Sequence, residues 1–213
     1  MQYKSKVDIV YEKLMQEIIK GTYQNGDRLV ISKIAAQNEI SEIPVREAIR
    51  RLESEGYVTV KANQGAVVSI LGKDDVLEIF QIKGILEGYA ARLSIQYLTE
   101  KDYEQLRKIN RRMAEAQDSG SNKSSADLNM QFHLYMYERI PQKQLFNMIT
   151  ELWKKWSITK AVFSLVPARG EDSVKEHEEI LEYMEDNLPD KVEAAVREHK
   201  FKAGYALAFK IGS

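Results

Sequence analysis

The sequence of 213 residues predicts a mainly α-helical protein whose helices are interrupted once by a short β-hairpin. Two observations support this prediction. Residues 44–70 contain an amphipathic helical segment, a glycine, and two short runs of β-forming residues around a polar turn. From residue 74 onward, apolar residues recur at helical spacing in long segments separated by turn and capping residues. We therefore expect an N-terminal domain over residues 1–70, a linker over 71–73, and an all-helical domain over 74–213.

The N-terminal domain should contain three helices before its hairpin. The first is expected over residues 5–20 and should end at Gly21, since glycine commonly follows the last residue of a helix. A short strand is expected over residues 29–31. Ser32 is a favourable N-cap, which predicts that the second helix starts there and runs to about Asn38.

The third helix is expected to begin at Pro44, because proline is pre-set for the first helical position. Arg46 and Arg50 lie four residues apart and can share one face of this helix, with Arg51 beside them. Gly56 should end the helix.

Two runs of strand-forming residues, 57–60 and 67–70, predict the hairpin, with Asn63, Gln64 and Gly65 in its turn. A short helix with arginines on its open face, followed by a hairpin, has the parts of a winged helix-turn-helix. The sequence therefore predicts a DNA-binding fold for this domain.

Taken alone, the arginines of the third helix would more often form a solvated face that pairs with Glu47 and Glu53. The predicted wing and the upstream helices favour DNA binding instead. Arg46 lies in the first turn, the end of such a helix that meets base edges, and arginine can pair bidentately with guanine. Arg50 and Arg51 lie further along and are better placed for phosphates or flanking bases.

The helical domain should be an antiparallel bundle, because its segments are joined by short loops. The breaks between segments carry Thr99, the loop 118–121, Pro141, Pro167 and Pro189. Six helices are expected, over residues 74–97, 100–117, 123–139, 143–166, 170–186 and 189–210.

Composition excludes several classes of protein. The net charge is −1 and neither half of the chain is strongly basic, so any affinity for DNA must depend on local placement of charge. The absence of cysteine excludes disulfides, thiol catalysis and Cys-ligated zinc. No apolar run approaches the ~18 residues of a membrane span, and no signal peptide is visible. We expect a cytoplasmic protein with no membrane partner.

These segments together resemble the GntR family of bacterial transcription regulators, in the FadR branch whose effector domain is the all-helical FCD type. Six rather than seven bundle helices resemble its VanR-like subgroup. In the N-terminal domain the resemblance is carried by Ser32–Ala35, Pro44–Leu52, Glu55–Val58 and Asn63–Val68. In the helical domain it is carried by Leu86-Glu87, Ala90–Leu93, Phe132-His133, His177–Leu181 and Glu198-His199.

The resemblance implies a homodimer that binds a palindromic operator in double-stranded DNA, with repression as the expected mode. It places Ser32 and Lys33 near phosphate, Lys61 on the DNA backbone, and Gln64 and Gly65 in the minor groove. Two residues depart from the family pattern: Glu42 and Ile43 stand where relatives usually carry Arg and Thr. These departures bear on the operator sequence rather than on the mode of binding.

The resemblance also implies a divalent metal in the bundle core. Lone histidines are more often surface or core residues than ligands, but all three histidines of this chain fall on the family's ligand positions. The ligands would be Asn129, His133, His177 and His199, with Asn129 replacing the family's Asp. Loss of that carboxylate weakens binding of a hard cation, whereas imidazole ligands suit Zn or Ni.

The effector implied by the resemblance is a small organic acid, bound with help from Lys83 or Arg92. For Lys83 an ordinary solvated lysine is an equal alternative. Two other functions remain open: a helical-bundle metalloenzyme that uses the three histidines, and a non-sensing DNA-binding dimer. Turnover of a bound acid would favour the former, and operator affinity that no ligand changes would favour the latter.

Overall fold

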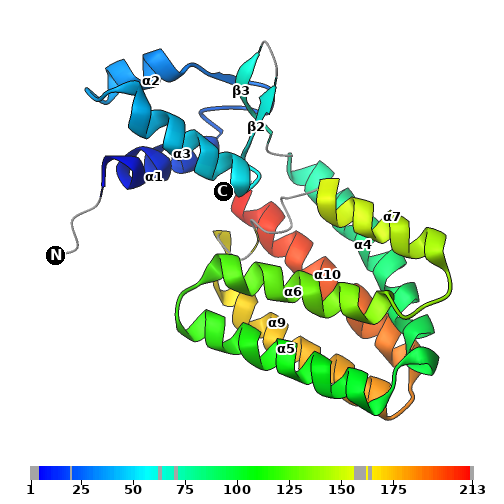
Figure 1. Cartoon of the computed structure of the whole chain (residues 1–213). Coiled ribbons are helices and arrows are strands. Elements are labelled where there is room, and N and C mark those ends of the chain that lie inside the picture. The colour runs from blue at the N-terminus through cyan, green and yellow to red at the C-terminus, as the bar shows by residue number, and fades with distance from the viewer. Residues whose placement is uncertain are drawn as a thin grey trace. The chain divides into compact units, whose positions relative to one another are not determined.

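The computed structural model describes residues 5–19, 21–61, 64–69, 72–155, 162 and 165–211. The chain divides into two compact units, which we call the N-terminal unit, residues 1–73 together with 210–213, and the helical unit, residues 74–209 (Figure 1). Within the described residues, no helix is both long enough and apolar enough to cross a membrane.

The N-terminal unit packs three helices against a small antiparallel sheet (Figure 1). The sheet has the order β1-β3-β2, so the hairpin strand β3 lies in the middle. The apolar faces of the first and third helices and one face of the sheet form the core, which includes Val10, Leu14, Ile18, Val45, Ile49, Leu52, Val58 and Val68. The elements are α1 (Lys6–Ile19), β1 (Arg28–Leu29), α2 (Ile31–Gln37), α3 (Glu42–Ser54), β2 (Val58–Lys61) and β3 (Gly65–Val68).

Two helices begin earlier than the sequence predicts. Helix α2 is capped by Val30, whose carbonyl accepts the first helical hydrogen bond from Ile34, so Ser32 is not the N-cap. Helix α3 has Ser41 at the N-cap, so Pro44 is its third residue rather than its first. A proline fits there because the first N–H groups of a helix have no intrahelical acceptor.

The strands also differ by a few residues from their predicted positions. Strand β1 ends at Leu29, and β3 begins at Gly65, which pairs with Lys61 of β2. Gly65 therefore belongs to a strand rather than to the turn, although its φ of +75° still favours glycine. The predicted turn residue Asn63 lies outside the described residues.

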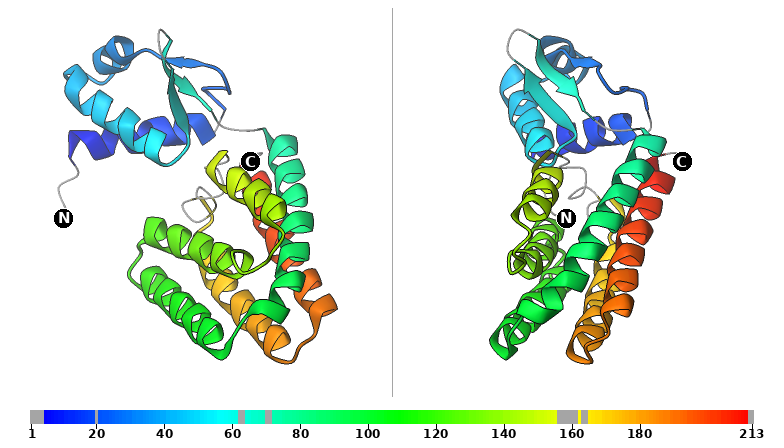
Figure 2. Two further views of the ribbon diagram at one scale, coloured as in Figure 1. Left: turned by 45° about the vertical axis from the view of Figure 1, so that its right-hand side comes forward. Right: turned by 90° about the vertical axis from the view of Figure 1, so that its right-hand side faces the viewer.

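The helical unit contains α4 (Lys73–Ser94), α5 (Glu100–Asp118), α6 (Asn122–Tyr137), α7 (Lys143–Lys155), α9 (Ala168–Glu185) and α10 (Pro189–Ile211), with a 3₁₀ turn at Ile95–Tyr97. Helix α5 packs against α6 and α9, and α4 runs beside α10 (Figure 2). The helix predicted over residues 143–166 is described as α7 only to Lys155, because most of residues 156–164 lie outside the described chain.

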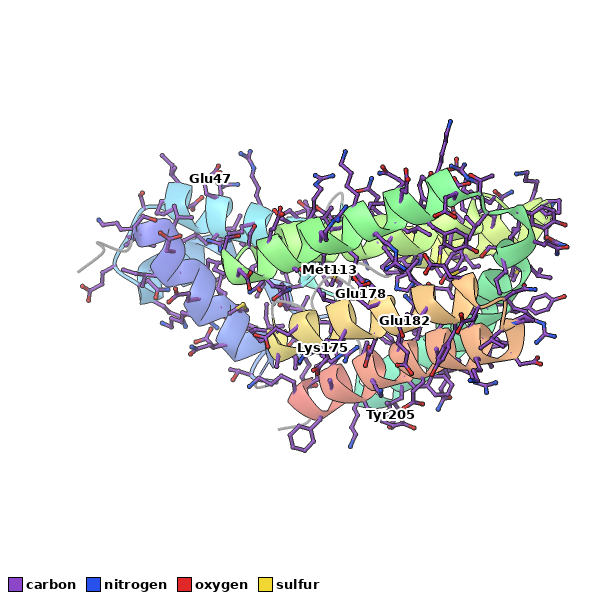
Figure 3. All side chains as sticks on the ribbon, turned by 90° about the horizontal axis from the view of Figure 1, so that it is seen from below. Glu47, Met113, Lys175, Glu178, Glu182 and Tyr205 are labelled. Carbon is purple, nitrogen blue, oxygen red and sulfur yellow. The ribbon has the colours of Figure 1, made fainter. Side chains whose placement is uncertain are left out.

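Contacts between helices hold the bundle on its polar sides as well. Asp102 closes a capping box with Thr99 at the start of α5 and also accepts a hydrogen bond from the Tyr135 hydroxyl of α6. On α9, Glu178 projects toward α5, where it contacts Arg107 and Asn110 (Figure 3). Tyr205 of α10 instead projects outward (Figure 3). The contacts of Asp102 and Glu178 join α5 to α6 and α9, which carry His133 and His177.

Candidate metal centre and nucleic-acid interface

Three buried histidines meet in the core of the helical unit. His133 lies on α6, His177 on α9 and His199 on α10. The Nε2 atom of His133 lies 3.1 Å from that of His199 and 3.3 Å from that of His177. Nitrogens bound to one ion at the Zn–N distance of ~2.0–2.1 Å stand roughly 3.0–3.5 Å apart. The three side chains therefore have the spacing of a shared ligand set.

Each histidine has a polar partner on its outer nitrogen. The Nδ1 atom of His199 lies 2.7 Å from the Glu176 carboxylate, and that of His133 lies 3.1 Å from the Tyr137 hydroxyl. The Nδ1 atom of His177 lies 3.0 Å from the side-chain oxygen of Asn110. Such outer partners are typical of metal-bound imidazoles, since they fix the tautomer and the ring orientation.

The orientation of the Asn110 amide follows from its other contacts. Its nitrogen donates to the Val174 carbonyl at 3.0 Å and to the Glu178 carboxylate at 2.7 Å. The oxygen must therefore face His177 and accept from its Nδ1–H. The Glu176 carboxylate can likewise only accept from His199. Consequently the Nε2 atoms of His177 and His199 both present lone pairs toward His133.

Burial keeps these imidazoles neutral. It lowers the pKa of His199 to about 4, against the opposing effect of Glu176, and lowers the pKa of His133 and His177 well below the ordinary value. Metal binding requires neutral imidazole. Neutral rings with converging lone pairs fit a divalent cation, and the donor set suits Zn or Ni.

Asn129 lies beside the triad, as the sequence predicts from its position one turn before His133. It is buried, and it lines a cavity together with His199. Its Oδ1 atom has no hydrogen-bond partner among the described residues. This oxygen is available as a further ligand, either to a metal or to a small molecule in the cavity.

Lys83 lies in the same cavity and is fully buried, which excludes the alternative of a solvated lysine. Its Nζ atom lies 2.9 Å from the Glu87 carboxylate, which also contacts Nζ of Lys200 at 3.0 Å. Both ammonium groups lie over the ring of Trp153, at 3.6 Å and 4.7 Å from its centre. Burial lowers the pKa of Lys83, and lowers that of Lys200 to about 7 despite the nearby Glu87.

Arg92 is not brought to this cavity. It is half-buried and forms ion pairs with Asp190 and Glu193 at the start of α10. Its expected role in binding an effector therefore has no support in the geometry. The physical reason is spacing: Arg92 lies nine residues after Lys83, about 13 Å further along the helix.

Several residues of the site were not predicted from the sequence. Glu176 and Lys200 each lie one position from a histidine, but neighbouring positions on a helix do not face the same way. Asn110, Tyr137 and Glu87 carry no recognisable local signal. Only the packing of α4, α5, α6, α9 and α10 brings these groups together. A charged residue at a core-facing position of a predicted helix, such as Glu87 or Lys200, would have been the one usable signal of the site in the sequence.

The arginines of α3 fall into two groups. Arg46 pairs with Glu42 at 2.7 Å and Arg50 with Glu47 at 2.9 Å, and all four side chains are largely exposed. Pairs of this kind contribute little to stability and exchange readily for other partners. Glu53, an expected partner of the arginines, instead accepts a hydrogen bond from the backbone N–H of Val60.

Arg51 is held against α1 instead. Its guanidinium lies 3.7 Å above the centre of the Tyr11 ring and contacts Asp8 and Glu55. Its contacts therefore join helices within the unit, and the expected phosphate contact would require breaking them.

The remaining expected DNA contacts lie at two places in the N-terminal unit. Ser32 and Lys33 are exposed in the first turn of α2, where N–H groups are free for an anion. Lys61 ends β2 and is exposed, and Gln64 and Gly65 lead into β3 directly opposite it. The two strands thus bring these three residues to one end of the hairpin.

Comparison with known families identifies both units. Residues 6–68 match the family of bacterial regulatory proteins called gntR, and residues 78–201 match the FCD domain. The chain belongs to the GntR family of transcriptional regulators, in the branch with an FCD domain. It is thus a DNA-binding regulator, and its relatives are regulators rather than enzymes.

Individual relatives agree with this assignment. The chain is 31% identical over 153 residues to the transcriptional regulator McbR of Escherichia coli K12, covering 72% of this chain and 69% of McbR. It is 27% identical to a probable D-xylose utilization operon repressor of Paenarthrobacter nicotinovorans, covering 89% and 83%. The solved structure of E. coli McbR has the same fold, with a TM-score of 0.65 at 24% identity over 99% of this chain and all of that one.

Proposed function

We propose that this GntR-family protein is a homodimeric repressor whose helical unit binds a divalent metal and a small organic acid. The observation that carries the proposal is the convergence of three neutral imidazole nitrogens, each ring held by an outer partner. The Nε2 lone pairs of His177 and His199 both face His133, and one N–H of His133 could satisfy only one of them, whereas a cation would satisfy all three nitrogens. His133, His177 and His199 would hold the ion, and Asn129 stands beside them as the fourth candidate ligand.

The N-terminal unit would bind operator DNA in the cytoplasm. Arg46 and Arg50 would leave their exposed glutamate partners for bases and phosphates, while Ser32, Lys33, Lys61, Gln64 and Gly65 would contact the flanking backbone and minor groove. Repression is supported by the similarity to the Paenarthrobacter nicotinovorans relative, a probable repressor of a D-xylose utilization operon. A homodimer is supported by the two-fold symmetry that palindromic operators require.

Sensing would follow from the position of the cavity. A metal held by the histidines would supply Lewis acidity toward an acidic ligand. Lys83 would supply charge and Asn129 an amide group to orient that ligand. The Tyr137 hydroxyl contacts His133. Burial raises the pKa of Tyr137, and the nearby Glu87 carboxylate raises it further. A ligand that changes the contacts of Lys83 and Glu87 would therefore also change the surroundings of Tyr137 on α6. The ligand would change operator affinity only to the extent that it binds one arrangement of the dimer more tightly than the other.

The metal proposal is tested on the full-length protein after treatment with a chelator. We expect stoichiometric uptake of Zn or Ni, measured by elemental analysis after desalting, and loss of uptake in the His133→Ala, His177→Ala double variant. Glu176→Gln should weaken binding by roughly 10–100-fold, the effect typical of removing an outer partner. Glu179→Gln, an exposed position on the same helix, is the matched control and should bind as the unmodified protein does.

Two results would contradict the proposal. One is an unmodified protein that takes up neither metal. The other is a double variant that takes up as much as the unmodified protein does, since the ion would then lie elsewhere.

A further inference from the structure

The cavity beside the histidine triad is lined by more positive than negative charge. Lys83 and Lys200 are both buried, and both contact the single carboxylate of Glu87. No second carboxylate of the described residues contacts either ammonium group.

The other carboxylate near the triad, that of the half-buried Glu176, is already engaged. Glu176 pairs with Arg169 at 2.7 Å, with Lys202 at 3.3 Å and with His199. Glu176 therefore does not neutralise Lys83 or Lys200. A buried charge without a partner is costly, so the second ammonium group either loses its proton or gains another anion, and a bound anion favours the charged form.

The same cavity offers unused polar groups. It is lined by both lysines, His199, Ser173 and Asn129, whose Oδ1 atom has no described partner. A divalent ion on three neutral histidines would add two further positive charges. Asn129 adds no compensating charge, since it is an amide rather than a carboxylate. The positive charges of the loaded site would then exceed its negative charges by more than one.

We propose that this cavity selects small dicarboxylates over monocarboxylates, and that Lys200 is the residue that recognises the second negative charge. The inference rests on the proposed function, in which one carboxylate meets the metal beside Lys83. The cavity has a volume of about 20 Å³, so the acid enters only as the two lysine side chains move apart. The second carboxylate then lies between the two ammonium groups, where it replaces part of their shared contact with Glu87. Trp153, whose ring the lysines now cover, forms one wall of the site.

The test compares acids of equal carbon number in the zinc-loaded full-length protein. Malonate is titrated against propionate, and succinate against butyrate, by calorimetry after free zinc has been removed. One charge-assisted contact in a buried site favours the dicarboxylate by about tenfold or more. The Lys200→Met variant keeps the length of the side chain and removes its charge, so it should bind both members of each pair alike.

Lys191→Met is the matched control, because Lys191 lies on the same helix but is exposed. It should keep the full preference, which would show that loss of a lysine charge elsewhere on α10 is not enough to abolish it. Zinc content measured before and after titration separates loss of metal from loss of ligand binding.

Equal affinities within both pairs, binding of neither class, or a Lys200→Met variant that keeps the preference would each overturn the inference. A protein that binds zinc and operator DNA but no dicarboxylate refutes this inference alone. A protein that takes up no metal refutes the proposed function instead.

Discussion

At the scale of single residues, the contacts of the α3 arginines separate recognition from stability. Among the residues that the structure describes, Arg46 and Arg50 pair with exposed glutamates of their own helix, at (i, i+4) and (i, i+3) spacing. Arg51 bridges α3 to α1 through the Tyr11 ring and Asp8. Three neighbouring arginines on one helix are thus engaged in different ways, although the sequence presents them as one group.

Alanine variants of these residues should therefore differ in kind. Arg46→Ala should lose discrimination between operator and unrelated DNA by ~1–3 kcal/mol, the worth of one bidentate base contact. Arg51→Ala should leave that discrimination nearly unchanged and lower the free energy of unfolding by ~1 kcal/mol, through lost cation–π and ion-pair contacts. Gel-shift titrations and urea denaturation measure the two effects. An Arg46→Ala protein with full discrimination would remove the assignment of α3 as the recognition helix.

At the scale of elements, glycines set the close approach of α4 and α10. A Cβ atom at Gly88 would lie 2.9 Å from the carbonyl oxygen of Glu193, and one at Gly204 would lie 2.5 Å from Cβ of Phe80. At Gly84 the first obstacle is the ring of Phe201, at 2.6 Å. Backbone and Cβ atoms cannot move without moving a helix, whereas a ring can rotate. The two helices that carry Lys83, Glu87, His199 and Lys200 are thus held at a fixed spacing.

The loss of stability on substituting these glycines should depend on which atom blocks the added Cβ. Gly88→Ala and Gly204→Ala should each lower the free energy of unfolding by ~1–3 kcal/mol, because overpacking outweighs the ~1 kcal/mol gain in helix propensity. Gly84→Ala should cost less, and Gln81→Ala, exposed on α4, should lie within ~0.5 kcal/mol of the unmodified protein. Chemical denaturation monitored by circular dichroism gives the ranking. A stabilised Gly88→Ala variant would show that the helices are not in close contact there.

At the scale of the whole molecule, binding to DNA must come from placement and assembly rather than from net charge. The chain has a net charge of −1, and one winged helix reads only a few base pairs. Two copies double the number of base and phosphate contacts and match a two-fold operator.

We therefore expect a homodimer at micromolar concentration. Light scattering should give twice the mass of the chain, and the operator complex should contain two chains. Reducing an inverted-repeat operator to one half-site should weaken binding far more than changing its flanking sequence. A strictly monomeric mass with operator affinity retained would contradict the expectation.

The sequence by itself determined the mainly α-helical fold, the winged helix-turn-helix and the membership of the GntR family. Helical periodicity, turn residues and capping residues act within a few positions, so they are readable along the chain. The sequence also singled out His133, His177 and His199, which the structure brings together. Helix starts were less accurate, since Val30 and Ser41 cap α2 and α3 through backbone geometry without side-chain hydrogen bonds.

Only the tertiary structure decided what surrounds the histidines. Glu87, Asn110, Tyr137, Glu176 and Lys200 come from five different helices, and their meeting depends on how those helices pack. The same packing buries Lys83 and leaves Arg92 on ion pairs elsewhere, although both lie on α4. Burial and long-range charge pairing are properties of the assembled core, so no local pattern encodes them.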